Sequence, residues 1–180
     1  MTAEDISIAL HARLNYGKFH PVVFSNMIIL DSPWESDVIS VSDCYYWTEY
    51  EIKVSLADYR ADFKKVLSGY QKDSPTKHEL YASGDPISRN FWGTTEVSKP
   101  AQFYFVTPAG LLDGVDIPEH CGHMEFHEGE DWPFKRMSLT RKAPRLKKAS
   151  KLSMKQLYNL TGKATAKSHT YRSVLNSREI

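Results

Sequence analysis

Apolar residues recur along the chain with two different periods, which predict both helices and strands. Ile6, Leu10 and Leu14 repeat at near-helical spacing and predict a helix over residues 3–14. Ser55 has the character of a helix N-cap and predicts a helix that ends near residues 68–69. β-rich runs predict strands over residues 21–30, 37–42, 46–54, 103–107, 121–127 and 137–140, and a short helical piece over residues 77–82. Strands flanked by helices in this order predict an α/β fold with a mixed central sheet.

Two stretches depart from this pattern. Residues 68–100 are interrupted by Gly and Pro, and residues 84–99 are interpreted as an insertion or a mobile loop. From Ser153 the chain has the pattern of a basic amphipathic helix, which either ends after Gly162 or continues to about Asn176. We therefore predict one domain over residues 1–150 and a basic C-terminal helical extension over residues 151–180.

Charge is distributed unevenly along the 180 residues. The net charge is only +1, yet residues 135–180 hold thirteen Lys and Arg against a single acid, Glu179. Residues 1–134 hold ten Lys and Arg against twenty-one Asp and Glu. A basic end on an acidic body indicates either contact with a polyanion, with nucleic acid as the leading candidate, or a solvated basic helix.

Several features favour a cytoplasmic protein that does not contact a membrane. Cys44 and Cys121 are too few and too far apart for a disulfide framework. No apolar run reaches the ~18 residues that span a bilayer. The N-terminus lacks the basic start and apolar stretch of a signal peptide. We expect a cytoplasmic location.

Two neighbouring predicted strands carry an acid–acid–lysine pattern. Residues two apart on a strand point to the same face, so Glu51 and Lys53 project together. Asp37, at the start of the neighbouring strand, reaches the same place. Two carboxylates suit Mg²⁺, which takes its other ligands from water and phosphate, and an adjacent lysine can orient a metal-bound water. The pattern predicts a metal-dependent phosphodiesterase site; the alternative is a salt bridge between Glu51 and Lys53 on an exposed strand.

Six blocks of sequence, two of which contain this site, match a known superfamily and follow one another in the same order as in that superfamily. The blocks are residues 36–41, 48–55, 57–65, 77–81, 103–108 and 142–146, and together they span about residues 20–150. In these blocks the chain resembles the PD-(D/E)XK nuclease superfamily, and most closely the MmcB-like DNA-repair nucleases and their phage-encoded relatives. The resemblance covers a whole domain and implies a restriction-endonuclease-like core.

The resemblance also implies an activity. Asp37 and Glu51 would bind Mg²⁺, or Mn²⁺ as a substitute, together with the backbone carbonyl of Ile52. Lys53 would position the attacking water and would lie exposed on the strand face. The implied protein is a Mg²⁺-dependent DNA endonuclease in phage or bacterial DNA processing or repair, and a homodimer is compatible with this. If the protein is phage-encoded, the expected location is the bacterial host cytoplasm. The alternatives are a non-cleaving DNA-binding module of the same fold and a phage accessory or structural protein.

Basic residues elsewhere are candidate nucleic-acid contacts. Lys77 and His78 follow the acidic site in the family pattern, and we expect them either to contact phosphate or position water, or to be surface charges. Arg145, Lys147 and Lys148 in the basic part of the chain are further candidates for binding DNA.

Other polar residues have open roles. Glu49 shares the face of Glu51 by parity, and we expect an outer-face charge rather than a third metal ligand. Glu4 matches only loosely the helix acid of many such nucleases, and a helix-dipole role explains it equally well.

A histidine cluster over residues 120–127 admits a second metal hypothesis. If this segment is a strand, His123, Glu125 and His127 share one face, an arrangement able to hold Zn²⁺. Related sequences carry apolar residues at the first two of these positions. A solvent-facing strand edge is therefore the favoured interpretation.

Overall fold

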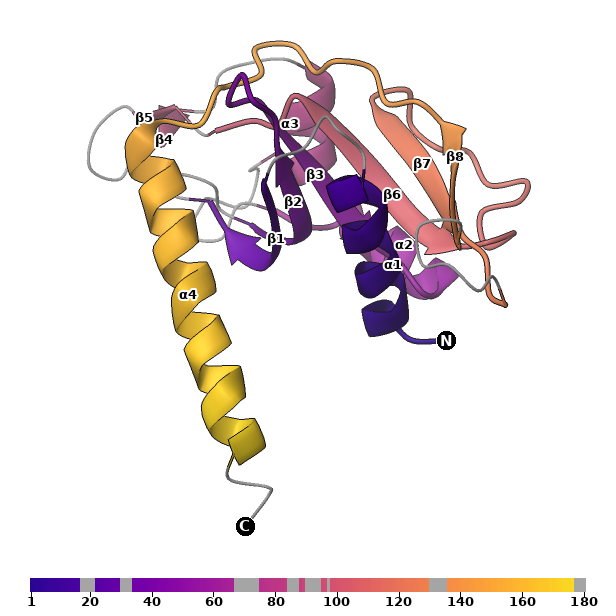
Figure 1. Ribbon diagram of the computed structural model, residues 1–180. Helices are drawn as coiled ribbons and strands as arrows, with labels where there is room; N and C mark the ends of the chain where they lie inside the picture. Colours follow the sequence, from indigo (N-terminus) through magenta and orange to yellow (C-terminus); the bar gives the residue numbers. More distant parts are fainter. Residues whose placement is uncertain are drawn as a thin grey trace.

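A six-stranded sheet runs through the middle of the molecule (Figure 1). The computed structural model describes residues 1–16, 22–29, 34–66, 75–83, 88–89, 95–96, 98–129 and 136–176. Its elements are α1 Ala3–Tyr16, β1 Val22–Ile28, β2 Glu35–Val41, β3 Trp47–Ile52, α2 Leu56–Asp62, α3 Lys77–Ser83, β4 Ser88–Arg89, β5 Thr95–Glu96, β6 Gln102–Pro108, β7 Cys121–Phe126, β8 Met137–Arg141 and α4 Met154–Asn176.

The sheet is mixed, as predicted. Its strand order is β1-β2-β3-β6-β7-β8. β1, β2 and β3 are antiparallel neighbours, β6 and β7 run parallel to β3, and β8 is antiparallel to β7. β4 and β5 form a separate two-stranded sheet within the predicted insertion, whose residues 84–87, 90–94 and 97 lie outside the described part of the chain. The prediction of an α/β fold with a mixed sheet flanked by helices is confirmed.

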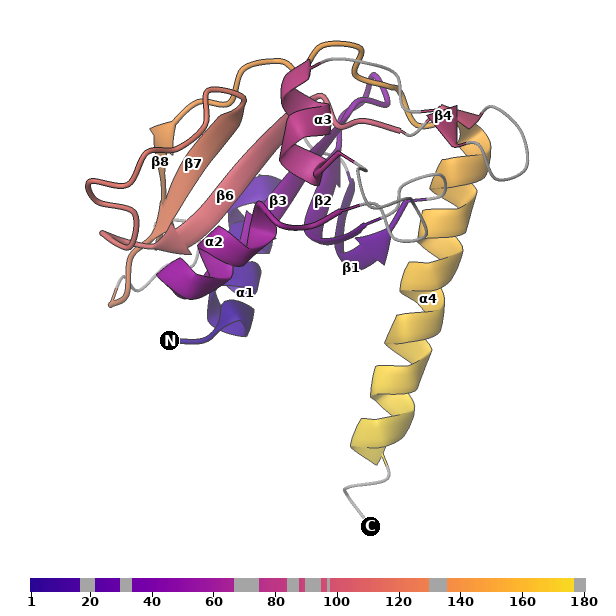
Figure 2. The same ribbon diagram turned by 180° about the vertical axis from the view of Figure 1, so that it is seen from behind.

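Helices cover both faces of the sheet. α1 lies on one face, and α2 and α3 lie on the other (Figures 1 and 2). Tyr50 and Ile52 of β3 pack in the core beneath α1. Because strand side chains alternate, Glu49, Glu51 and Lys53 point to the α2–α3 face. There they lie beside the aromatic core of this face, which includes Tyr59, Leu80, Tyr81, Phe103 and Phe105.

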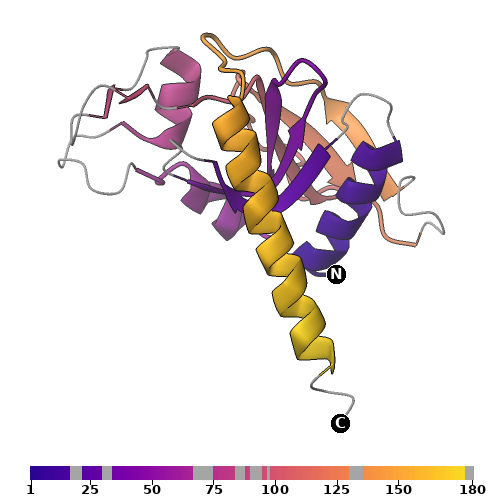
Figure 3. The ribbon, with the colours of Figure 1, turned by 60° about the vertical axis from the view of Figure 1, so that its left-hand side comes forward.

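The start of the predicted extension belongs to the core. Leu152 and Leu160 are 4% and 0% exposed and pack against Ile39, Trp47 and other apolar residues of β1–β3. α4 crosses β1 at the edge of the sheet and then projects away from it (Figure 3). The helix reaches Asn176, the longer of the two predicted alternatives. The predicted boundary at residue 150 therefore falls within a packed unit.

One helix ends earlier than predicted. Ser55 does cap α2, accepting the backbone N–H of Asp58, but the helix stops at Asp62 and not near residues 68–69, which lie outside the described residues. The backbone N–H of Lys65 donates to Asp62 O in a tight turn, and Val66 forms a β-bridge with Thr76. This turn brings the Lys65 side chain back toward β3.

Among the described residues, no helix is both long and apolar enough to cross a membrane.

Candidate active site

Asp37 lies where the pairing of β2 with β3 ends and where its pairing with β1 is interrupted, opposite Asn26. The pairing of β2 with β3 ends at Val38–Tyr50, and the next position along the same register sets Asp37 opposite Glu51. The backbone N–H of Ile52 donates to the side chain of Asp37, at 2.8 Å from Oδ2, and not to a backbone carbonyl of β2. On the other side of β2, Asn26 has a positive φ of 51°, a conformation that Asn tolerates better than most residues.

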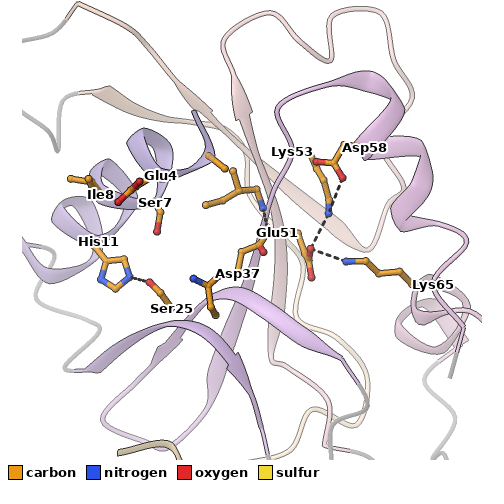
Figure 4. A pocket seen from close by; sticks show the side chains of 13 residues that line it. Glu4, Ser7, Ile8, His11, Ser25, Asp37, Glu51, Lys53, Asp58 and Lys65 are labelled. Carbon is orange, nitrogen blue, oxygen red and sulfur yellow. Dashed lines mark hydrogen bonds and ion pairs between the residues drawn. The ribbon is translucent and has the colours of Figure 1, made fainter. Parts of the chain in front are cut away.

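A pocket of about 920 Å³ opens at this break in the sheet. Figure 4 shows Asp37, Glu51 and Lys53 in its wall, with Glu4 on α1 across from them. The structure thus brings the three predicted site residues to one cavity. It also places Glu4 there, the acid that the sequence matched only loosely.

Glu51 is buried and surrounded by lysines. Its Oε2 atom lies 3.0 Å from Lys53 Nζ and 3.1 Å from Lys65 Nζ, and its Oε1 atom lies 2.6 Å from Lys77 Nζ. Burial raises the pKa of Glu51, but the ammonium charges, led by that of Lys77, bring it below its ordinary value. Glu51 is therefore a carboxylate at neutral pH.

Lys53 is buried, which corrects the expectation of an exposed lysine. It is 4% exposed, and its ammonium lies 2.9 Å from Asp62 Oδ1 as well as beside Glu51. Burial lowers its pKa, but the charges of Glu51 and Asp62 raise it above the ordinary value overall. Two carboxylates therefore hold the Lys53 ammonium charged and fixed in direction.

Asp62 is a further carboxylate in this group of buried ion pairs. We call the group the ion-pair layer; it consists of Glu49, Glu51, Lys53, Asp62, Lys65 and Lys77. Asp62 accepts from His78 Nε2 at 2.8 Å and lies 2.6 Å from Lys65 Nζ. Burial raises its pKa, but the bond from His78 and the nearby lysine charges bring it well below the usual range. Neither Asp62 nor Lys65 stood out in the sequence. Their only signal was membership of the matching block over residues 57–65, since the early end of α2 decides where both side chains lie.

Glu49 is not an outer-face charge. It is 1% exposed, lies 2.8 Å from Lys77 Nζ, and accepts from Tyr81 Oη at 2.6 Å and Ser36 Oγ at 2.9 Å. Its oxygens are thus occupied beneath α3. The expectation failed because strand parity gives the face of a side chain but not whether a helix covers that face.

Lys77 and His78 do not face solvent, so neither direct phosphate contact nor a role as surface charges fits these two residues. Lys77 is 0% exposed and bridges Glu49 and Glu51. His78 is 5% exposed, and it bonds to Asp62 and His120. Both side chains serve to hold the ion-pair layer together.

The remaining candidate DNA contacts lie away from the pocket. Arg145, Lys147 and Lys148 are exposed, and Arg145 stacks over Tyr46 at 4.1 Å from the ring centroid. The neighbouring Leu146 donates to the backbone of Ala101, beside the first residue of β3. The pocket is at the other end of β3, so the structure does not bring these basic residues to the site.

The three zinc ligands predicted on β7, which are His123, Glu125 and His127, do not come together as a site. His123 bonds to Thr107 Oγ1 at 2.8 Å, and His127 bonds to Ser138 Oγ at 2.7 Å. Glu125 accepts from the Gly110 backbone and from Thr140. Each of the three side chains has a separate partner, and in the part of the chain that is described they do not form a metal-ligand group.

Asp37 differs electrostatically from Glu51. Burial and the charge of Glu51 raise its pKa to about 6, although the Ile52 N–H and nearby lysines act in the opposite direction. Asp37 therefore carries a negative charge that its surroundings compensate only in part. Two carboxylates on neighbouring strands, one of them short of positive charge, form an oxygen donor set that fits a hard divalent cation.

Comparisons with known proteins bear on the fold alone. No protein-family model and no curated protein matches the sequence. A solved structure, a protein of unknown function from Silicibacter pomeroyi, is similar over 99% of this chain and 94% of that chain, with a TM-score of 0.56 and 14% identity. The chain therefore shares an α/β architecture with that protein along nearly the whole length of both.

Proposed function

We propose that this protein is a Mg²⁺-dependent DNA endonuclease of the PD-(D/E)XK type, built on a restriction-endonuclease-like core. One observation carries the proposal. Asp37 and Glu51 come to one pocket where β2 and β3 separate, with the Lys53 ammonium 3.0 Å from Glu51. The element order supports it, because a helix, three antiparallel strands, a helix and a parallel strand are compatible with that core.

Each residue has a chemical role in this proposal. Asp37, Glu51 and the Ile52 carbonyl would hold Mg²⁺, which would acidify a bound water and offset charge on a phosphate. Lys53 donates toward the water or the phosphate oxygen, and Glu51 and Asp62 hold it in place. Because that ammonium is fixed before substrate arrives, little reorganisation is needed during the reaction.

Lys53→Met should lower Mg²⁺-dependent cleavage of DNA by at least about a hundredfold, because it removes a fixed donor next to the reacting phosphate. Cleavage by the parent protein should require Mg²⁺ or Mn²⁺ and stop with EDTA. The matched control is Lys64→Met, which changes an exposed lysine just after α2. If Lys53→Met is folded by circular dichroism and cuts at the parent rate, the assignment of Lys53 is wrong.

The basic helix α4 provides a surface for DNA beside the pocket. Lys163 Nζ donates to Ile28 O at 3.0 Å, and Lys167 Nζ donates to Asn26 O. Asn26 is also a pocket-lining residue. Both lysines are exposed and stand close to the proposed cleavage site, where they can meet a DNA backbone.

Lys163→Gln together with Lys167→Gln should weaken DNA binding and flatten its salt dependence. The slope of log affinity against log salt on duplex DNA should fall by about 0.9 for each phosphate group that the variant no longer binds. Substitutions are preferable to deletion of residues 151–180, which would also remove Leu152 and Leu160 from the core. Fluorescence anisotropy in EDTA over a series of salt concentrations measures the slope.

The matched control for this pair is Lys147→Gln with Lys148→Gln, at the far end of β3. If only the control pair flattens the slope, DNA runs over that end of the molecule. The proposed path along α4 would then be wrong.

A specific observation favours the non-cleaving DNA-binding module as the second candidate. Three lysines already surround Glu51, and this could balance its charge without a metal. A binding module would hold DNA with the same salt slope but would not cut it in Mg²⁺ or Mn²⁺. If the parent protein cleaves DNA and Lys53→Met does not, the protein is the endonuclease. If the parent binds DNA without cleaving it, the protein is the binding module.

A further inference from the structure

Three nitrogen and sulfur donors converge away from the pocket. His78 comes from α3, while His120 and Cys121 come from the start of β7, and one ligand atom from each lies within 4.8 Å of the others. His78 Nδ1 is 3.0 Å from His120 Nε2 and 3.9 Å from Cys121 Sγ. Both segments border the α2–α3 face, visible in Figure 2, and not the α1 side of the pocket.

These separations are close to those of a metal tripod. Zn–N bonds of about 2.0–2.1 Å and a Zn–S bond of about 2.3 Å, set at tetrahedral angles, place two nitrogens about 3.3 Å apart and a nitrogen about 3.6 Å from a sulfur. Both of the observed separations from His78 Nδ1 differ from these by about 0.3 Å. Two of the three separations are therefore close to those of a tetrahedral site, and the third, between His120 and Cys121, is below 4.8 Å.

His78 is already oriented as a metal ligand. Its Nε2 atom lies 2.8 Å from Asp62 Oδ2, and because a carboxylate only accepts, Nε2 carries the proton. When the ring is neutral its lone pair is on Nδ1, which faces the other two donors. A histidine that donates its second ring N–H to a carboxylate is the usual arrangement around protein-bound zinc.

The surroundings are apolar enough to hold the ligands in place. The His78 ring lies 4.3 Å from the ring of Phe63 and 5.5 Å from that of Phe105, measured between centroids. Cys121 is 0% exposed, whereas His120 is only partly buried. Solvent therefore reaches the cluster from the side of His120.

We propose that His78 Nδ1, His120 Nε2 and the Cys121 thiolate form a binding site for a borderline-soft divalent cation, with Zn²⁺ the best fit. On binding, the thiol proton passes to solvent, and a water takes the fourth position. Nitrogen and sulfur donors select against Mg²⁺, so this site would not compete for the cation of the pocket. Asp62 connects the two places, since it contacts both His78 and Lys53.

The alternative is a metal-free hydrogen bond between the two histidines. In that case His120 Nε2–H would donate to His78 Nδ1, and the thiol would be a buried apolar group. The 3.0 Å separation of the two nitrogens is compatible with either arrangement, so metal binding itself must be measured.

Metal titrations of tag-free protein would test the site. The background is Cys44→Ser, which removes the exposed thiol, and the protein is first stripped with a chelator. Calorimetry with Zn²⁺ should give one tightly bound ion per chain, and Asp37→Asn should retain it. Co²⁺ should give the visible bands of tetrahedral cobalt together with a thiolate-to-cobalt charge-transfer band. His120→Ala should weaken Zn²⁺ binding at least about tenfold, and Cys121→Ser should remove the charge-transfer band.

Two controls keep the result specific. Asp37→Asn alters the pocket and should leave the cobalt spectrum unchanged, and His127→Ala, which removes a histidine bonded to Ser138, should bind as the parent does. Absence of the charge-transfer band in the parent, or equal Zn²⁺ affinity in His120→Ala, would overturn the proposal. Because His120 is partly exposed, that variant decides the question even if Cys121→Ser fails to fold. None of these measurements depends on nuclease activity.

Discussion

Lys77→Met is expected to lower the free energy of unfolding by about 3–5 kcal/mol, the cost of leaving buried charge unpaired. The ammonium of this fully buried residue lies 2.8 Å from Glu49 and 2.6 Å from Glu51. Burial lowers its pKa, but these two carboxylates raise it well above the ordinary value. Removing the ammonium leaves the buried Glu49 carboxylate without the charge that it pairs with, whereas Glu51 keeps Lys53 and Lys65. Because a typical domain is stable by about 5–15 kcal/mol, the loss would be large.

Urea denaturation at pH 7 would measure this loss, with Lys64→Met as a matched control that should change stability by less than about 0.5 kcal/mol. Adding Glu49→Gln to Lys77→Met should restore part of the stability, because one unpaired charge is removed. A loss below about 1 kcal/mol for Lys77→Met alone would show that the buried ion-pair layer does not support the fold.

Asp37→Asn is expected to abolish Mg²⁺ and Mn²⁺ binding in the pocket, and with it cleavage, while making the protein more stable at neutral pH. Asn keeps the size of Asp and can still accept the Ile52 N–H, but it lacks the charge that a divalent cation requires. The structure predicts the opposite effect on stability for Glu51→Gln, because that change leaves three lysines without their shared carboxylate.

The stability gain should depend on pH in a defined direction. Folding raises the pKa of Asp37 from 3.8 to about 6, mainly through burial and the charge of Glu51. The unfolded chain therefore ionises first as pH rises, and the parent loses stability between about pH 4 and pH 6. Asp37→Asn avoids this loss, which is about 1–3 kcal/mol at pH 7 and vanishes below about pH 4.

Thermal denaturation from about pH 3.5 to 8, with and without Mn²⁺, would measure both effects. Mn²⁺ should raise the melting temperature of the parent but not that of Asp37→Asn. The control is Asp43→Asn, an exposed turn residue, which should respond to pH and to Mn²⁺ as the parent does. A variant at Asp37 that still binds Mn²⁺ with parent affinity would place the metal elsewhere.

The sequence by itself determined most of the framework. Two periods of apolar residues predicted α1, the strands of the mixed sheet and the capped start of α2, because periodicity is a local property of the chain. The period of two along β3 also placed Glu51 and Lys53 on one face, and Asp37 did reach the same pocket. The roles of these residues in cleavage stay predictions.

The tertiary structure alone decided which charges are buried and paired. Parity could not show that α2 and α3 cover the face of β3, so Glu49, Lys53 and Lys77 were expected near solvent and are instead buried. The early end of α2 brings Lys65 to Glu51, fourteen residues away along the chain. The His78–His120–Cys121 cluster likewise joins segments separated by some forty residues. Such contacts depend on the depth and register of packing between distant elements, which no local pattern of residues specifies.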